Sequence, residues 1–171
     1  MADLAVSLRT HRQAADTFLA DARSVPAAQW NQPRAPGKWS PGQVVEHVTL
    51  AYEANRNVVR GVPVGATAPR LLRPLIRRFL LDPVLRRGRF FPGSKSPKIF
   101  RPSSPPPAPA ELVGRLEAAV KGFEADAAGA RDVTLDHPFF GRLPLADFVR
   151  LQEIHTRHHN GQLPPAKATR A

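Results

Sequence analysis

The chain has 171 residues, with 25 Lys and Arg against 14 Asp and Glu, a formal net charge of +11 and no cysteine. The length fits one domain with its own core, and the lack of thiols excludes disulfides, thiolate metal ligands and a cysteine nucleophile. The positive charge predicts attraction to an anionic partner without identifying it. No apolar run approaches the roughly 18 residues of a membrane-spanning helix, and charges interrupt the N-terminal stretch, so we expect a cytoplasmic protein.

The positive charge and the prolines are concentrated in the middle of the chain. Between Pro69 and Arg101, ten Lys and Arg stand against one acid, Asp82, whereas the rest of the chain has fifteen against thirteen. Prolines gather in the same region, which ends in "RPSSPPPAPAEL". The sequence therefore predicts a single domain over residues 1–165, with a basic, proline-rich crossover at residues 61–108, and a C-terminal tail at residues 166–171.

Two helices are predicted before the crossover. The first has an apolar stripe at helical period, made of Leu4, Leu8, His11, Ala15, Phe18, Leu19 and Ala22. The second begins in "GKWSPGQVVEHV", where Ser40 can cap the helix, Pro41 suits its first position and Gln43 can complete a capping box. Its inward stripe consists of Val44, Val48, Ala51, Asn55 and Val58, with His47 beside it.

The crossover itself contains apolar residues at helical spacing. They lie in "RLLRPLIRRFLLDPVLRRGRF", where Pro74 and Pro83 should break the run into short pieces. We expect residues 69–90 to form one or two short helices on the open end of the helical core. Their apolar side should face the core, and their arginines should face outward and provide cationic contacts to an anionic ligand. Two alternatives to this packed arrangement remain. The charged segment can lie in solvent without packing on the core, or it can form a basic amphipathic helix that binds an anionic membrane. The apolar residues concerned are Leu71, Leu72, Leu75, Ile76, Phe79, Leu80 and Leu81.

Two further helices follow the crossover. One runs from about Pro109 to Ala128, and the other from Pro144 to about Leu163, where two prolines stop it. The residues expected to be buried on the third helix are Leu112, Leu116, Ala119, Val120 and Phe123. No segment alternates convincingly as a strand. Four amphipathic helices of similar length predict an all-α fold, an antiparallel four-helix bundle whose second and third helices are joined by the long crossover.

The histidines of the fourth helix are the strongest candidates for a functional site. His155 and His159 lie roughly 40° apart near the centre of the apolar stripe, and His158 falls on its flank. Two imidazoles at this spacing can converge on one ion, but a hydrogen-bonded or half-exposed pair is the simpler interpretation. The zinc-protease motif is excluded, because Thr156 stands where its glutamate is needed. His47, on the inner side of the second helix, can complete a set of three neutral imidazoles.

Three segments, "APGKWSPGQVVEHV", "HPFFGRLPLADF" and "IHTRHHNGQL", together resemble the DinB-like superfamily of four-helix-bundle metalloproteins, also described as YfiT-like. The resemblance implies one divalent metal, held by a histidine of the second helix and two histidines four residues apart on the fourth. By position these are His47, His155 and His159. Two departures stand out: Leu143 and Pro144 replace the hydroxyl-bearing cap usual before the last helix, and residues 61–104 match no family motif.

The same resemblance implies a function. Its members use the metal to activate the sulfur of a low-molecular-weight thiol for transfer onto an electrophile or for an isomerisation, so a thiol S-transferase or hydrolase with zinc or nickel is expected. A small anionic substrate and pairing into a homodimer are the implied partners. Two alternatives remain: a non-catalytic metal-binding or stress-response protein, and a binder of nucleic acid or membrane surfaces through the arginine-rich crossover.

Several other residues are assigned structural roles. His11 is expected at the core boundary and not as a ligand, and His137 is expected to fix the turn before the fourth helix. Phe139 and Phe140 should close the end of the bundle. Trp39 is expected to pack ahead of the Ser40 cap and not against a ligand.

Three polar residues near the predicted site have more than one interpretation. Gln162 and Glu46 can contact the imidazoles, but surface or capping roles are equally consistent with their positions. Asp147 falls in the first turn of the fourth helix, where its charge suits the helix dipole.

Overall fold

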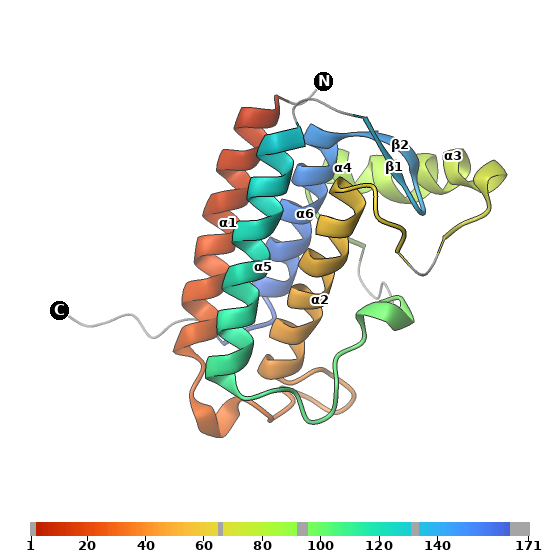
Figure 1. Ribbon diagram of the computed structural model, residues 1–171. Helices are drawn as coiled ribbons and strands as arrows, with labels where there is room; N and C mark the ends of the chain where they lie inside the picture. The colour runs from red at the N-terminus through yellow and green to blue at the C-terminus, as the bar shows by residue number, and fades with distance from the viewer. Residues whose placement is uncertain (1–2, 65–66, 92–95, 131–133, 165–171) are drawn as a thin grey trace.

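The computed structural model describes residues 3–64, 67–91, 96–130 and 134–164 (Figure 1). Most of these residues are helical, and four long helices lie side by side: α1 (Leu4–Ser24), α2 (Pro41–Val59), α5 (Pro109–Ala130) and α6 (Leu145–Asn160). α1 and α6 run in one direction and α2 and α5 in the other (Figure 1). The predicted C-terminal tail lies outside the described residues. No helix within the described ranges is both long enough and apolar enough to cross a membrane.

The long crossover explains the pairing of these helices. α1 packs most extensively on α6, and α2 on α5, so each close pair runs in the same direction. A short loop cannot join two helices that run the same way, because the chain must first return along their full length. Residues 61–108 make that return between α2 and α5.

The starts of the first two helices follow from their capping residues. The Asp3 carboxylate accepts from the backbone N–H groups of Ala5 and Val6 at the start of α1. At α2, the Ser40 hydroxyl accepts from the Gln43 N–H, and the Gln43 side chain accepts from the Ser40 N–H. The predicted capping box is therefore confirmed. It fixes the beginning of the helix that carries His47.

Aromatic side chains from the four long helices meet in the core. Phe18, Tyr52, Phe123 and Phe148 come one from each helix and are almost fully buried. The Phe123 ring lies 5.7 Å from Tyr52 and 6.1 Å from Phe148. All the apolar residues predicted for the inner stripes of α2 and α5 are buried: Val44, Val48, Ala51, Val58, Leu112, Leu116, Ala119, Val120 and Phe123.

A small β-hairpin precedes α6, and here the expectation of no strand is wrong. β1 (Thr134–His137) pairs antiparallel with β2 (Gly141–Pro144). Gly141 has a φ of +68°, which suits the left-handed position that a three-residue hairpin loop requires. Strands of four residues contain too few alternations to be recognised from apolar periodicity.

The chain between α2 and α5 contains consecutive short helical pieces: η2 (Arg70–Leu72), α3 (Arg73–Ile76), the π-helical η3 (Arg77–Leu81) and α4 (Asp82–Arg87). Pro74 and Pro83 stand in the first turns of α3 and α4, so the predicted division into short helices is confirmed. Two further 3₁₀ turns are η1 (Ala27–Gln29) and η4 (Lys98–Phe100).

The predicted orientation of this segment is wrong. Leu81 and Val84 are buried, but most of the apolar residues expected to face the core are exposed: Leu71, Leu72, Leu75, Phe79 and Leu80. Two arginines occupy the inward side instead. Arg73 donates to the Ala68 carbonyl and to the Asp136 carboxylate, and Arg77 donates to the Arg142 carbonyl. The hairpin before α6, which the sequence did not predict, provides these acceptors.

The last part of the crossover is attached to the start of α2. The Glu46 carboxylate accepts from both the backbone N–H and the hydroxyl of Ser103, at 2.8 Å each. The Trp30 indole donates to the Pro107 carbonyl at 2.9 Å. Gly42 is needed at this contact, because a Cβ there would lie 2.6 Å from the Trp30 indole nitrogen. These bonds hold the crossover beside His47.

Candidate metal centre

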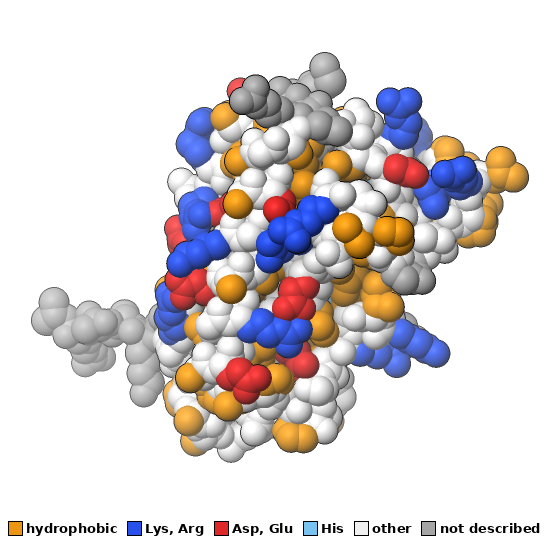
Figure 2. All heavy atoms as spheres, in the orientation of Figure 1, with side chains coloured by type: hydrophobic (Ala, Val, Ile, Leu, Met, Phe, Trp, Pro, Cys, Tyr) orange, Lys and Arg blue, Asp and Glu red, His pale blue; other side chains and the backbone are white. Residues whose placement is uncertain are grey.

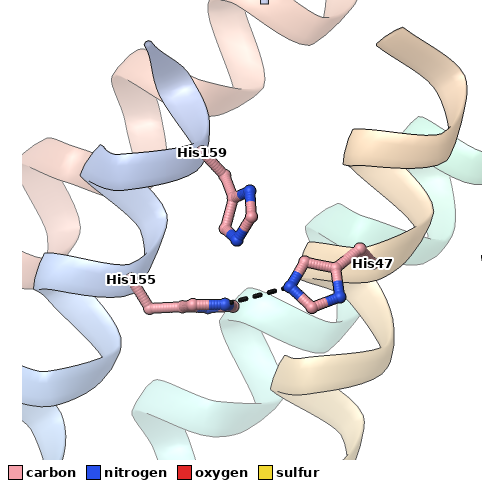
Figure 3. Close-up of side chains that lie close together, drawn as sticks. All are labelled: His47, His155 and His159. Atoms are coloured by element: carbon pink, nitrogen blue, oxygen red, sulfur yellow. Dashed lines mark hydrogen bonds between the residues drawn. The ribbon is translucent and has the colours of Figure 1, made fainter. Parts of the chain in front are cut away.

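Three imidazoles from two helices converge near one end of the helical core. His47 comes from α2, and His155 and His159 come from successive turns of α6 (Figure 3). One nitrogen of each ring lies within 4.8 Å of the others. Among the residues that the structure describes, no other group of three His, Cys, Asp or Glu side chains is so arranged. The structure thus brings together the three residues that the sequence selects as metal ligands.

The ring orientation of His47 is set by the crossover. Its Nδ1 lies 2.7 Å from the Phe100 carbonyl oxygen, which can only accept, so Nδ1 carries the proton. Nε2 therefore presents a lone pair toward α6. A backbone carbonyl that fixes the tautomer of a histidine in this way is a common feature of histidine metal sites.

His159 is oriented by the same kind of bond. Its Nδ1 donates a hydrogen bond to the Gln162 side-chain oxygen at 3.2 Å. The lone pair on Nε2 therefore remains available to a metal. Gln162 also binds the exposed His158, at 3.2 Å. Of the interpretations left open for Gln162, contact with an imidazole is therefore the one that the structure shows. Glu46, the other candidate for such a contact, binds Ser103 instead.

His155 provides the test of whether these residues fit a metal. Its Nε2 lies 3.1 Å from Nε2 of His47, and its buried Nδ1 has no hydrogen-bond partner. Two ligand nitrogens about 2.05 Å from a tetrahedral zinc ion lie about 3.3 Å apart, close to the observed separation. The two nitrogens thus face each other at a spacing that suits a shared cation. The donor set fits a borderline metal such as zinc or nickel.

The environment keeps all three imidazoles neutral near pH 7. Burial lowers the pKa of His47, and it lowers the pKa of His159 to about 3. The pKa of His155 falls well below its ordinary value, first because of burial and then because of the neighbouring His159 and His47. Only the neutral ring offers a lone pair to a metal, so the burial favours the protonation state that metal binding requires.

Aromatic rings form the wall around the three imidazoles. The Trp39 ring lies 4.8 Å from His47 and 6.3 Å from His159, and Phe90 lies 5.8 Å from His155. Trp39 also packs against the core, as predicted, but its contact with two candidate ligands was not expected. The segment that approaches the imidazoles is the later part of the crossover, which carries Phe90 and Phe100, and not its leucine-rich part.

The two histidines predicted to be structural lie elsewhere. His11 is fully buried, and burial lowers its pKa to about 4. Its Nδ1 donates to Glu124 at 3.0 Å, and its Nε2 accepts from the Tyr52 hydroxyl, also at 3.0 Å. His11 lies deeper than the expected core boundary, but its role is structural as predicted.

His137 holds the hairpin loop. Its Nδ1 accepts from the backbone N–H groups of Phe139 and Phe140, at 3.1 and 3.3 Å. The predicted role in the turn before the last helix is confirmed. Phe140 stacks on the imidazole and packs against the core, whereas the Phe139 ring is tilted relative to the imidazole, with 6.2 Å between ring centres. Asp147 lies in the first turn of α6, as expected.

Some residues that position the site could not be recognised from the sequence. Phe100 acts through its backbone carbonyl, which any residue type would provide. Ser103 lies in a proline-rich stretch that matches no motif. Trp39 was considered because it directly precedes the Ser40 cap, but only a packing role was expected for it.

Comparison with known proteins identifies the family of the chain. A family model described as the DinB superfamily matches residues 8–163. No curated protein and no solved structure gives a significant match. The family match includes all three candidate ligands, and it covers far more than half of the 171 residues. The chain therefore belongs to the DinB superfamily.

Proposed function

We propose that this protein is a metal-dependent enzyme in which His47, His155 and His159 hold one divalent ion, zinc or nickel, within a bundle of four long helices. The observation that carries the proposal is the convergence of three neutral imidazoles, of which His47 and His159 are buried and His155 is half-buried, with Nε2 of His47 facing Nε2 of His155 at 3.1 Å. Three protein ligands leave one position for water or substrate, which is the arrangement of catalytic zinc sites.

We further propose that the reaction is transfer of the sulfur of a small thiol onto an electrophile, or a related hydrolysis. A bound divalent ion lowers the pKa of a coordinated water or thiol toward neutrality. The chain's own residues would orient the substrate: Trp39, Phe90 and Phe100 offer apolar walls. Arg101, which follows Phe100, is exposed and offers a charge to an anionic thiol.

Hydrogen bonds that orient the ligands support the same function. Gln162 holds the His159 ring through Nδ1, so it is a positioning residue and not a ligand. Gln162→Leu should lower metal affinity by about tenfold without changing the number of ions bound. Isothermal titration of metal-free protein measures both quantities. Unchanged affinity would show that Gln162 does not position the ligand.

Turnover tests the enzymatic part of the proposal. Metal-loaded protein without a histidine tag would be screened with low-molecular-weight thiols and an electrophilic acceptor, and with activated esters. We expect activity that is lost in His155→Ala and retained in His158→Ala, because His158 is exposed and is not one of the three converging imidazoles. Equal activity in all three proteins would refute the assignment of the site. A protein that binds the metal but turns over no substrate would favour the non-catalytic metal-binding function.

A further inference from the structure

The crossover presents an apolar surface to solvent. Its large side chains are far more exposed than those of the core: Leu71 by 91 %, Phe79 by 68 %, Leu75 by 56 %, Leu80 by 54 % and Leu72 by 48 %. These five residues, here named the leucine face, lie within one stretch of ten residues. A soluble protein rarely exposes so many large apolar side chains together unless they contact a partner.

The segment that carries the leucine face is firmly attached on its other side. Leu81 and Val84 are buried against the protein, and Arg73 binds both the Ala68 carbonyl and the Asp136 carboxylate. At the end of α4, the Arg157 guanidinium of α6 donates to the Gly88 carbonyl at 3.0 Å. The exposure of the leucine face therefore follows from a defined orientation.

Unpaired positive charges surround the leucine face. Arg70, Arg78, Arg86 and Arg89 are exposed, and none has an acidic partner within the described ranges. Asp82, the only acid between residues 69 and 101, pairs with Arg77. Figure 2 shows hydrophobic and Lys or Arg side chains side by side on the part of the molecule that projects at α3.

We propose that the leucine face is a docking surface for an anionic phospholipid bilayer. The bilayer interior would take the leucines and Phe79, while lipid phosphates would pair with the surrounding arginines. Docking at this face would be peripheral, with the segment of residues 70–87 lying along the membrane surface. This inference does not depend on the function proposed for the metal site.

Two other possible partners, a second copy of the chain and nucleic acid, fit the leucine face less well. A second copy of the chain would cover the apolar residues, but it would bring two sets of unpaired arginines together, which is unfavourable. Nucleic acid would pair with the arginines, but the leucine face would gain nothing from a phosphate backbone. Only an anionic bilayer matches both the apolar residues and their charged border.

Vesicle flotation of the full chain tests the proposal. We expect binding to phosphatidylcholine vesicles that contain about one third phosphatidylglycerol, and weak binding to pure phosphatidylcholine. Phe79→Glu should lower the partition coefficient at least about tenfold, because it removes an inserted ring and adds a negative charge. The matched control is Val6→Glu, an exposed apolar residue on α1, which should change it less than about twofold.

A second pair of variants, which change the net charge by the same amount, tests the charged border. Arg78→Glu changes the charge by two units and should weaken vesicle binding about twenty-five-fold, since each charge near an anionic surface contributes about fivefold. Arg9→Glu, an equally exposed arginine on α1, should have little effect. No binding to anionic vesicles, equal binding to neutral ones, or equal losses in the controls would overturn the proposal. So would a dimer that Phe79→Glu dissociates, or nucleic-acid binding that survives Phe79→Glu.

Discussion

The hairpin loop before α6 should make the fold sensitive to mild acid through His137. Burial and then the nearby Arg73 lower the pKa of His137, and Asp136 opposes them, which leaves the pKa at about 4. The hydrogen bonds explain why the imidazole is neutral in the folded protein. Nδ1 accepts hydrogen bonds from two backbone N–H groups, and a protonated Nδ1 cannot accept them. The same imidazole stacks on Phe140 with 4.6 Å between ring centres.

The magnitude and its sign follow from the difference between the two pKa values. The ordinary value is 6.5 and the folded value is about 4, a difference of about 2.5, which corresponds to about 3 kcal/mol. Because the folded pKa is the lower one, this stabilisation is complete above pH 6.5 and is lost as the pH falls toward 4. Between pH 7 and pH 5, about 2 kcal/mol of it should disappear.

His137→Asn isolates this effect. The Asn side-chain oxygen can accept from N–H groups two and three residues ahead, as in an Asx-turn, but it does not titrate. The free energy of unfolding would be measured for both proteins by urea titration at several pH values. The wild-type protein should lose about 2 kcal/mol more than the variant between pH 7 and pH 5. Parallel pH profiles would refute the reasoning, whatever the constant offset between them.

Two further predictions concern packing inside the fold. Tyr52→Phe leaves the buried His11 ring without its hydroxyl partner, so it should lower the free energy of unfolding by about 1–3 kcal/mol in chemical denaturation. A loss below about 0.5 kcal/mol would show that the network does not stabilise the core. Gly42→Ala should cost about 1–3 kcal/mol, because its Cβ would meet Trp30 and Pro106, whereas Gly114→Ala on an open face of α5 should stabilise by about 0.5–1 kcal/mol. Equal thermal midpoints for the two alanine variants would contradict this difference.

Local signals account for the parts of the fold that the sequence predicted. The Ser40 capping box and the 3.6-residue spacing of Leu112, Leu116 and Phe123 act within one helix, so they can be identified without knowing its neighbours. Helical spacing also indicated the three candidate ligands, although only the resemblance to the DinB-like superfamily implied that they bind a metal. His155 and His159 are adjacent on one helical face, and His47 lies on the inner side of another helix.

The misassigned parts depend on contacts between distant segments. The leucine-rich segment turns its apolar side outward because Arg73 and Arg77 find acceptors on a hairpin more than sixty residues away in the chain. Apolar periodicity alone cannot reveal such acceptors, and it favours burying leucines. The carbonyl of Phe100 and the hydroxyl of Ser103 reach α2 through a proline-rich path with no recognisable pattern.

Metal content tests the central claim most directly. Protein prepared without a histidine tag would be saturated with zinc or nickel, freed of excess ion and analysed for bound metal per chain, together with three single-alanine variants. We expect about one ion per chain in the wild type and in His158→Ala, and none retained by His47→Ala or His159→Ala. Circular dichroism would establish that each variant is folded. Retention of the ion by folded His159→Ala, or its loss from folded His158→Ala, would contradict the assignment of the three ligands.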